Sequence, residues 1–190
     1  SEIPFSSSRK MMVCIVEPSK TAVPADKAAF EATLDSALDF GAPRVAHIKG
    51  APNYILDKCT KVLRNGALIE LTPALKQEIL DKVDELSSQA LRVLAIAMRP
   101  MENTKPLPED VDQRFQVCVQ DVTLVGLVAS IDPERDGVKQ AVEDAKTAHV
   151  RTVMITGDYL KTAQAIAKNI AILPPDGSLD KNGAVDCNSL

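Results

Sequence analysis

The segment from Val153 to Ile170 constrains the fold more than any other part of the chain. The apolar residues of VMIT run straight into Thr156-Gly157-Asp158, and a helix-patterned stretch begins at once at Leu160. In α/β proteins, ligands bind at the carboxyl ends of strands. A hydroxyl and a carboxylate at this position therefore predict a ligand site, and the backbone amides that open the helix favour an anionic ligand.

A second apolar stretch precedes this segment and indicates an α/β unit. VTLVGLVASI (122–131) is nearly all apolar, which is typical of a parallel strand buried on both faces. We expect Asp132-Pro133 to cap a helix with an inward stripe of Val138, Ala141, Val142 and Ala145. We expect RTVMIT (151–156) to form a second buried strand. A helix at 160–171 completes a βαβα unit with a right-handed crossover.

The first part of the chain has a different pattern, which predicts an α+β module with an antiparallel sheet and flanking helices. We expect strands at 11–16, 44–49 and 90–99, helices at 25–41, 52–59 and 73–87, and a hairpin at 62–71 that turns at Asn65-Gly66. The Pro- and acid-rich stretch 101–113 reads as a loop. The sequence thus predicts an α+β domain over residues 1–115 and part of an α/β domain over residues 116–190.

The composition narrows the class of protein. The net charge of −4 and the scattered Lys and Arg residues argue against a nucleic-acid partner. No apolar run approaches the length of about 20 residues that crosses a bilayer, so a membrane part is expected only outside these residues. The four cysteines form no CxxC pair and only two histidines occur, so we expect thiols in a reducing cytosol and no metal site.

Several residues near strand ends are candidates for ligand contacts, and each has a plain structural alternative. Gly50 permits a close approach of backbone to ligand and Lys49 supplies a positive charge, although Lys49 also suits a surface turn. Phe5 can stack on a base or pack in the core. Arg9 and Lys10 read as a solvated pair.

Three further groups in the second half of the chain are candidates. Arg92 lies in the apolar stretch ALRVLAIA and is expected to need a carboxylate or a phosphate as a partner. Asp132 and Arg135 belong to DPER, which also suits a helix cap. Thr156 can donate to a phosphate oxygen and Asp158 can hold a sugar hydroxyl or a metal-bound water, but this tripeptide also occurs in ordinary turns.

Taken in order, EIPFSSSRKMM, IKGAP, ALRVLAIA, DPERDGVKQAV and VMITGD resemble the cytoplasmic catalytic region of P-type ion-pumping ATPases, in particular the calcium-pump and sodium/potassium-pump branch. The resemblance covers nearly the whole chain. It implies that residues 1–115 are the C-terminal part of the nucleotide-binding domain. Residues 116–190 would then begin the returning segment of the phosphorylation domain, which has a Rossmann-type, haloacid-dehalogenase-like fold.

The resemblance also implies roles for individual residues in the nucleotide-binding domain. Phe5 would lie against the adenine of ATP, and Lys10, Lys49 and Gly50 would line the same pocket. Arg92 corresponds to the family arginine that reaches the ATP phosphates.

In the phosphorylation domain, the resemblance implies a second set of contacts. Thr156, Gly157 and Asp158 correspond to the TGD motif that meets ATP from the opposite side. Asp132 and Arg135 correspond to the DPxR motif near the hinge between the domains.

The implied function is that of an ATP-binding part of a pump. In the parent protein, ATP with Mg²⁺ would phosphorylate an aspartate and drive cation transport, with calcium as the expected ion and sodium or sodium/potassium as the alternative. Besides ATP, the implied partners are the transmembrane helices and actuator domain of the same pump, at the cytosolic face of a membrane. The phosphorylated Asp-Lys-Thr-Gly is absent from these 190 residues, which are expected to be inactive alone. A stand-alone haloacid-dehalogenase-type phosphatase and a non-catalytic nucleotide-binding module are the competing interpretations.

Overall fold

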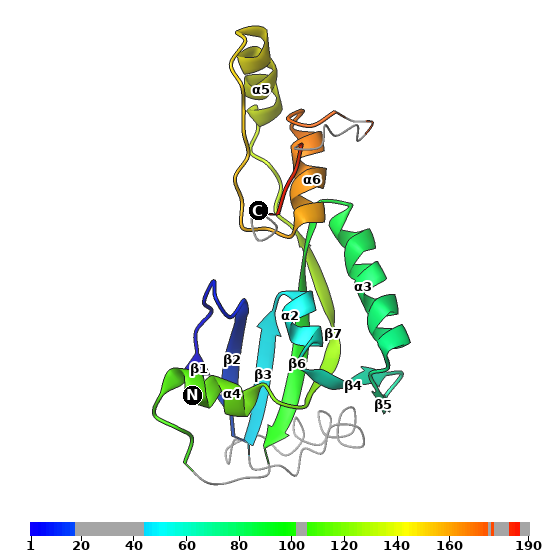
Figure 1. The fold of residues 1–190 in the computed structure, drawn as a ribbon, viewed down its shortest axis with the longest axis vertical. Helices are drawn as coiled ribbons and strands as arrows, with labels where there is room; N and C mark the ends of the chain where they lie inside the picture. Colours follow the sequence, from blue (N-terminus) through cyan, green and yellow to red (C-terminus); the bar gives the residue numbers. More distant parts are fainter. Residues whose placement is uncertain (18–43, 102–105, 175, 177–182, 187–190) are drawn as a thin grey trace, which may run out of the picture. The chain divides into compact units, whose positions relative to one another are not determined.

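Seven strands in the described part of the chain form one sheet in the order β1-β2-β3-β6-β7-β4-β5 (Figure 1). The computed structural model describes residues 1–17, 44–101, 106–174, 176 and 183–186, so the helix predicted at 25–41 lies outside the described residues. The strands are β1 Glu2–Ile3, β2 Met11–Val16, β3 Arg44–Gly50, β4 Cys59–Arg64, β5 Ala67–Glu70, β6 Leu91–Met101 and β7 Val122–Ile131.

The strand pairs within residues 1–115 are antiparallel, as predicted, but the sheet as a whole is mixed because it also includes β7. β1, β2, β3 and β6 pair antiparallel in this order, and β4 and β5 form an antiparallel hairpin. β7 is a parallel strand, as predicted, but its parallel partner is β4 from the first half of the chain. It is not buried on both faces throughout, because its ladder with β4 ends at Leu124 and Val128 and Ile131 are exposed.

Five helices lie within the described residues. They are α2 Pro52–Leu56, α3 Pro73–Ser87, α4 Val111–Cys118, α5 Val138–Thr147 and α6 Leu160–Asn169. The longest of them, α3, has 15 residues, and none of these described helices has the length and apolar content of a membrane span. The predictions of α3 and α6 are confirmed, and the predicted helix at 52–59 is shorter, because β4 already begins at Cys59.

Two features that local sequence specifies form where the sequence predicts them. Asn65 and Gly66 join β4 to β5 and both have positive φ, at 53° and 77°, as a two-residue hairpin turn of type I′ requires. At the start of α3, the Thr72 hydroxyl accepts a hydrogen bond from the Leu75 amide at 3.2 Å. Pro73 at the first helical position needs no amide partner.

The helix α4 corrects the prediction of a loop through residue 113. Its start is capped by Asp110, whose carboxylate accepts a hydrogen bond from the Gln113 amide at 2.8 Å. Phe115 and Cys118 are 5% and 0% exposed and anchor the helix in the core. The cap and the apolar spacing were present in the sequence, but the preceding prolines and acids obscured them.

The segment 151–156, predicted to be a buried strand, forms no strand in the structure. Val153 is 67% and Ile155 is 92% exposed. A strand is defined by hydrogen bonds to a neighbouring strand. Within the described residues no strand pairs with this segment, so its apolar residues have no ladder to join.

The predicted cap of α5 is also wrong. The helix begins at Val138, and its N-cap is Gly137, with a positive φ of 82° and no side-chain hydrogen bond. Asp132 lies six residues before this start. Its carboxylate instead pairs with an arginine of β6, and of the predicted inward stripe only Val142 is fully buried.

The described residues pack into two compact units, each discontinuous in sequence. Unit 1 comprises Ser1–Leu80 and Leu94–Val128, and unit 2 comprises Asp81–Val93 and Ala129–Leu190. The predicted division at residue 115 follows the chain, whereas α3, β6 and β7 each contribute residues to both units. The division of the chain into domains of a parent protein stays a prediction.

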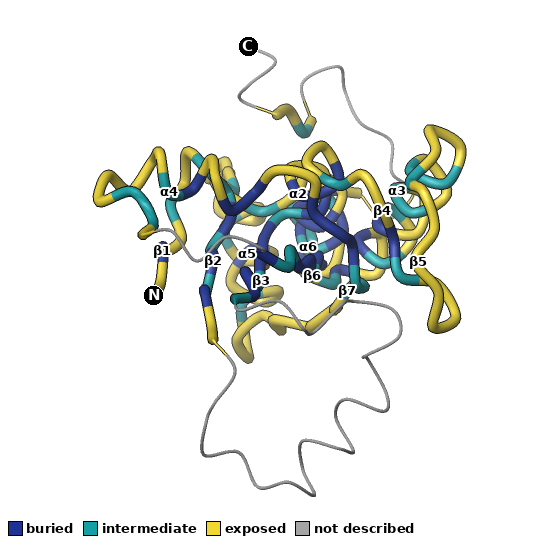
Figure 2. Tube along the Cα trace, turned by 90° about the horizontal axis from the view of Figure 1, so that it is seen from below, coloured by how far each residue is buried: buried dark blue, intermediate teal, exposed yellow. Residues whose placement is uncertain are grey.

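Unit 1 has a contiguous apolar core. Alternate residues of β2 face it, so Met11, Val13 and Ile15 are buried, and Figure 2 shows this alternation along β2. The core is completed by residues from the other strands and helices of this unit, including Ile3, Ile48, Ile55, Leu56, Ala95, Phe115 and Val122.

Gly50, the last residue of β3, lies where two backbones approach closely. It pairs with Met11 of β2. A Cβ at position 50 would lie 2.3 Å from the carbonyl oxygen of Lys10 and 2.9 Å from the Met11 Cα, which is closer than real Cβ atoms pack. The glycine therefore permits a close approach to the protein's own backbone and fixes where β2 begins.

We expect Gly50→Ala to lower the free energy of unfolding by about 1–3 kcal/mol, the usual cost of overpacking a close contact. Gly126→Ala in β7 is the matched control, because a Cβ there has no atom within 4 Å. Alanine in that strand should leave stability unchanged or raise it by about 0.5–1 kcal/mol. Urea unfolding followed by circular dichroism measures both, and equal stabilities would show that the approach of β2 to β3 is not constraining.

Candidate functional site

Four of the predicted residues lie at the end of the β2–β3 pair where β2 begins and β3 ends. Lys49 pairs with Met12, and the Ala51 amide donates a hydrogen bond to the Lys10 carbonyl at 3.0 Å. Gly50 lies beside Lys10, as described above. Phe5 belongs to the loop that leads into β2. Two lysines and an aromatic ring thus come from chain segments that are about 40 residues apart but adjacent in unit 1.

The exposure of Phe5 excludes one of its two predicted roles. The residue is 59% exposed, so it does not pack in the core. An accessible aromatic ring can stack on a flat ligand. Lys10 has a positive φ of 55°, and its amide donates to the Ser6 carbonyl at 2.8 Å, which closes the turn directly after Phe5.

A second group of predicted residues meets around Arg92 in unit 2. Its Nε donates to Asp158 Oδ1 at 3.0 Å, and its Nη2 lies 2.8 Å from the same oxygen. Its Nη1 lies 3.4 Å from Asp132 Oδ2. The structure therefore brings together three residues that the sequence predicts from three different motifs.

The expected burial of Arg92 is wrong, although its expected carboxylate partner is present. The side chain is 51% exposed. Strand residues alternate between two faces, and in β6 Val93 and Ala95 are buried while Arg92 and Leu94 are exposed. The apolar sequence around Arg92 concealed this alternation.

The Thr156-Gly157-Asp158 segment forms a self-contained turn before α6. The Thr156 hydroxyl donates to Asp158 Oδ2 at 3.0 Å and accepts from the Asp158 amide at 3.1 Å. Gly157 is exposed, and a Cβ there would meet nothing within 4 Å. Arg135 is also exposed, in the stretch before α5. Ordinary turn chemistry thus accounts for the local geometry, while Asp158 still presents a carboxylate to Arg92.

The charge balance of the Arg92 cluster limits what it can bind. One guanidinium faces the carboxylates of Asp132 and Asp158, so the cluster carries a net negative charge. Asp132 is 70% exposed, so its pair with Arg92 contributes little to stability and is readily exchanged, whereas Asp158 is only 20% exposed. The five N–H donors of the guanidinium allow Arg92 to contact a phosphate as well, and the exposed pair with Asp132 is the one that a phosphate can replace.

Asp84 of α3 is a residue of unit 2 that sequence reasoning missed. Its carboxylate accepts a hydrogen bond from Tyr159 Oη at 2.9 Å and also pairs with Lys161 Nζ. Thr162, buried in α6, donates to the Leu91 carbonyl at 3.0 Å. These contacts position the start of α6, which follows Asp158 directly. Nothing in the sequence indicates them, because the partners are about 75 residues apart.

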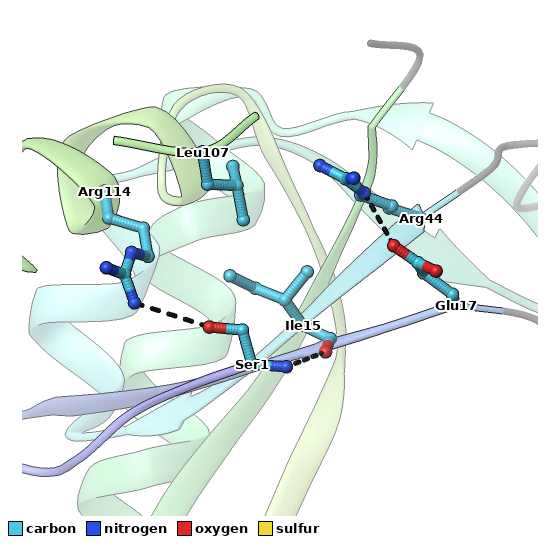
Figure 3. A pocket seen from close by; sticks show the side chains of 6 residues that line it. All are labelled: Ser1, Ile15, Glu17, Arg44, Leu107 and Arg114. Atoms are coloured by element: carbon cyan, nitrogen blue, oxygen red, sulfur yellow. Dashed lines mark hydrogen bonds and ion pairs between the residues drawn. The ribbon is translucent and has the colours of Figure 1, made fainter. Parts of the chain in front are cut away.

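The pocket of unit 1 lies at the opposite end of the β2–β3 pair from Lys10 and Lys49. It has a volume of about 610 Å³, and Figure 3 shows its lining residues: Ser1, Ile15, Glu17, Arg44, Leu107 and Arg114. Arg44 Nε donates to Glu17 at 2.9 Å, and Arg114 Nη2 donates to the Glu109 carbonyl at 2.7 Å. No predicted residue lines this pocket, and its arginines are engaged within the protein.

Metal ligands do not converge in the described part of the chain. Across residues 1–17, 44–101 and the described residues beyond 105, no group of three or more His, Cys, Asp or Glu side chains could hold a metal ion. The carboxylates of Asp132 and Asp158 both pair with Arg92. These residues by themselves do not fit a magnesium site.

Tyr159 provides a test of the Asp84 contacts. Burial raises the pKa of Tyr159, and the hydrogen bond to Asp84 and its negative charge raise that pKa further. We expect Asp84→Asn to lower the pKa of Tyr159, because the charge is removed while burial remains. Absorbance at 295 nm during alkaline titration measures this in a Tyr54→Phe background, since the chain has only two tyrosines.

The raised pKa of Tyr159 also determines how the stability of the fold changes with pH. Tyr159 stabilises the fold below about pH 10, the ordinary tyrosine value, and this contribution is lost as the pH rises through the folded-state pKa. Glu85→Gln is the matched control on α3, because Glu85 pairs with Lys82. An unchanged Tyr159 titration in Asp84→Asn would show that the hydrogen bond is absent in solution.

Comparison with known proteins connects these residues to a family. The calcium-transporting ATPase 1 of Lactococcus lactis is 34% identical over 173 residues, which are 91% of this chain and 16% of that protein. The calcium-transporting ATPase of Bacillus subtilis is 34% identical over 179 residues, 94% of this chain and 17% of its own length. The P-type sodium-transporting ATPase4 of Toxoplasma gondii is 31% identical over 204 residues, 100% of this chain and 15% of its own length.

The chain thus spans 15–17% of the length of these relatives. Residues 1–137 match the family described as P-type ATPase, cytoplasmic domain N. The resemblance stated from the sequence motifs is confirmed. Because the matched residues are more than half of the 190, the chain belongs to the P-type ATPases and includes part of their cytoplasmic N domain.

Proposed function

We propose that the chain binds ATP with the adenine against Phe5 and with Lys10, Lys49 and Gly50 lining the pocket. The observation that carries this proposal is the β2–β3 register, which places the two lysines at one end of the pair, beside the turn that presents an exposed Phe5. Aromatic stacking supplies affinity for the base, and the lysines complement the negative charge of the nucleotide. Membership of the N-domain family supports nucleotide binding independently.

We also propose that the Arg92 cluster of unit 2 binds phosphate. Arg92 binds a phosphate oxygen that replaces Asp132, because the ion pair with Asp132 is exposed and readily exchanged. Thr156 offers a hydroxyl, and Arg135 offers a second guanidinium from the neighbouring DPER segment. Arg92 is suited to this role because a guanidinium can bind phosphate through two parallel hydrogen bonds.

In the parent protein, we assign the reaction to ATP hydrolysis through an aspartyl-phosphate, with Thr156, Gly157 and Asp158 contributing to the phosphoryl-transfer site. Catalysis of this kind depends on positioning and on stabilisation of the phosphate charge. Mg²⁺ bound with ATP would neutralise part of that charge. The described residues alone do not fit a Mg²⁺ site.

We propose that the N-domain part extends past the predicted limit at residue 115. Two observations support this extension: the family match reaches residue 137, and β7 pairs with β4 in the same sheet. The phosphorylation-domain part then begins after β7 and includes α5 and α6. On this proposal, the remaining partners are the actuator domain and transmembrane helices of the parent, with the chain at the cytosolic face of a membrane.

Calcium is the proposed transported ion. Relatives from Lactococcus, Bacillus and Listeria that are 34–36% identical are named calcium-transporting ATPases. Sodium is the second candidate, because relatives from Toxoplasma and Plasmodium at 31% and 34% identity are named sodium-transporting. Ion-stimulated ATPase activity of the parent, measured with calcium and with sodium, separates the two.

We expect the chain to bind ATP with an affinity on the order of millimolar, about 4 kcal/mol, since one stacked base and a few charge contacts carry the binding. Phe5→Ala should weaken binding several-fold, because it removes the stacking surface. Amide chemical shifts of isotope-labelled protein during an ATP titration give the affinity and the location.

Leu68→Ala is the matched control for this substitution. Leu68 is an exposed apolar residue, at 39%, in β5 at the opposite edge of the sheet from β1. It should bind ATP like the unmodified chain. Equal affinities of Phe5→Ala and Leu68→Ala would remove Phe5 from the site.

We also expect the 190 residues alone to form no phosphoenzyme. Phosphoryl transfer in this family needs the aspartate of Asp-Lys-Thr-Gly, which this sequence does not contain. Incubation with γ-labelled ATP and magnesium, followed by an acid quench and hydroxylamine, detects an aspartyl-phosphate. Hydroxylamine-sensitive label on this chain would favour the self-contained phosphatase instead.

A further inference from the structure

Arg9 links the loop that carries Phe5 to the helix α4. Its Nη1 donates to Asp112 Oδ1 at 2.8 Å, and its Nη2 donates to the Pro4 carbonyl at 3.3 Å. Its guanidinium carbon lies 5.5 Å from the centroid of the Phe115 ring, a cation–π distance. The side chain is only 19% exposed, which corrects the prediction of a solvated Arg9–Lys10 pair.

The guanidinium of Arg9 contacts two parts of unit 1, the loop before Phe5 and the helix α4. Pro4 is the residue directly before Phe5, so the guanidinium holds the backbone that carries the aromatic ring. Asp112 and Phe115 belong to α4, and Phe115 is 5% exposed within the core of unit 1. Arg9 therefore ties an exposed loop to a fixed part of the protein.

We propose that Arg9 is a positioning residue that holds Phe5 in place for stacking on the nucleotide base. This inference rests on the proposed nucleotide site. The loop is short and turns sharply, because the Lys10 amide donates to the Ser6 carbonyl and the Arg9 amide to Ser6 Oγ at 3.2 Å. With both the turn and the Pro4 carbonyl held, Phe5 has little backbone freedom left, and the entropy lost on binding a base is smaller.

A direct contact of Arg9 with phosphate fits the structure less well. Its Nη atoms are committed to Asp112 and Pro4, and its Nε is buried without a hydrogen-bond partner among the described residues. A buried unpaired N–H is costly, so the packing around Arg9 must hold it there. Arg9 thus acts through Phe5, whereas the neighbouring Lys10 is free of these contacts and available to ligand.

The test compares ATP with inorganic tripolyphosphate, which lacks the base. We expect Arg9→Ala in the full 190-residue chain to weaken ATP binding about 3- to 10-fold, since only part of the stacking contribution is lost. Tripolyphosphate binding should not change. In a Phe5→Ala background, Arg9→Ala should have no further effect on ATP, because the ring that it positions is gone.

Two additional variants serve as a control and as a substitute for Arg9→Ala. Arg64→Ala is the matched control, because Arg64 also pairs with a helix carboxylate, Glu78, but lies in β4; it should bind ATP normally. If Arg9→Ala fails to fold by circular dichroism, Asp112→Asn replaces it, since Asp112 is 80% exposed and its loss is milder. It should weaken ATP binding in the same base-dependent way.

Three outcomes would overturn the inference. They are unchanged ATP affinity in the folded variant, an equal loss for tripolyphosphate, and additive effects of Arg9→Ala and Phe5→Ala. If Phe5→Ala itself leaves ATP binding unchanged, the proposed adenine site fails and the inference fails with it. Weaker ATP binding in Phe5→Ala alone would leave the site standing and reject only the role of Arg9.

Discussion

The close antiparallel pairing of β2 with β3 is the constraint on which the proposed site depends. At its end, Gly50 lacks a Cβ where one would lie 2.3 Å from the Lys10 carbonyl oxygen. This contact sets where β2 begins, and so where the loop with Phe5 must turn. β3 also pairs with β6, from Arg44–Met101 to Gly50–Ala95, so a neighbouring strand holds β3 on each side. Lys10 and Lys49 are thus adjacent through backbone geometry rather than through any attraction between the two cations.

The cluster around Arg92 follows a different principle. Its geometry depends on ion pairs, of which the exposed one, between Arg92 and Asp132, is readily exchanged. Asp158 and Asp132 pair with the guanidinium, and on the proposed function a phosphate would take the place of Asp132. The turn of Thr156-Gly157-Asp158 is held by its own hydrogen bonds, whereas α6, which follows it, is held by Tyr159 and Lys161 on Asp84. The cluster therefore combines an arginine whose ion-pair partner can change with a backbone that hydrogen bonds hold in place.

Features encoded by a few neighbouring residues could be predicted from the sequence. The Asn65-Gly66 turn and the start of α3 at Thr72 are of this kind, because their backbone conformations and caps are local. Short motifs identify the candidate residues Phe5, Lys10, Lys49 and Arg92. The exposure and contacts of these side chains could not be predicted from the same motifs. A segment becomes a strand only when a neighbouring strand pairs with it. The apolar residues of 151–156 do not reveal whether such a partner exists. Asp132 was interpreted as a cap although its partner is Arg92, and Asp84 carried no local signal at all.

The central claim is that the base of ATP stacks on Phe5 at the Lys10–Lys49 end of unit 1. Intermolecular nuclear Overhauser effects between the adenine protons of bound ATP and carbon-labelled side chains test it most directly. The account predicts contacts from the adenine to the Phe5 ring and to the side chains of Lys10 or Lys49. Contacts instead to Ile15 or Leu107, in the pocket at the opposite end of the β2–β3 pair, would contradict it.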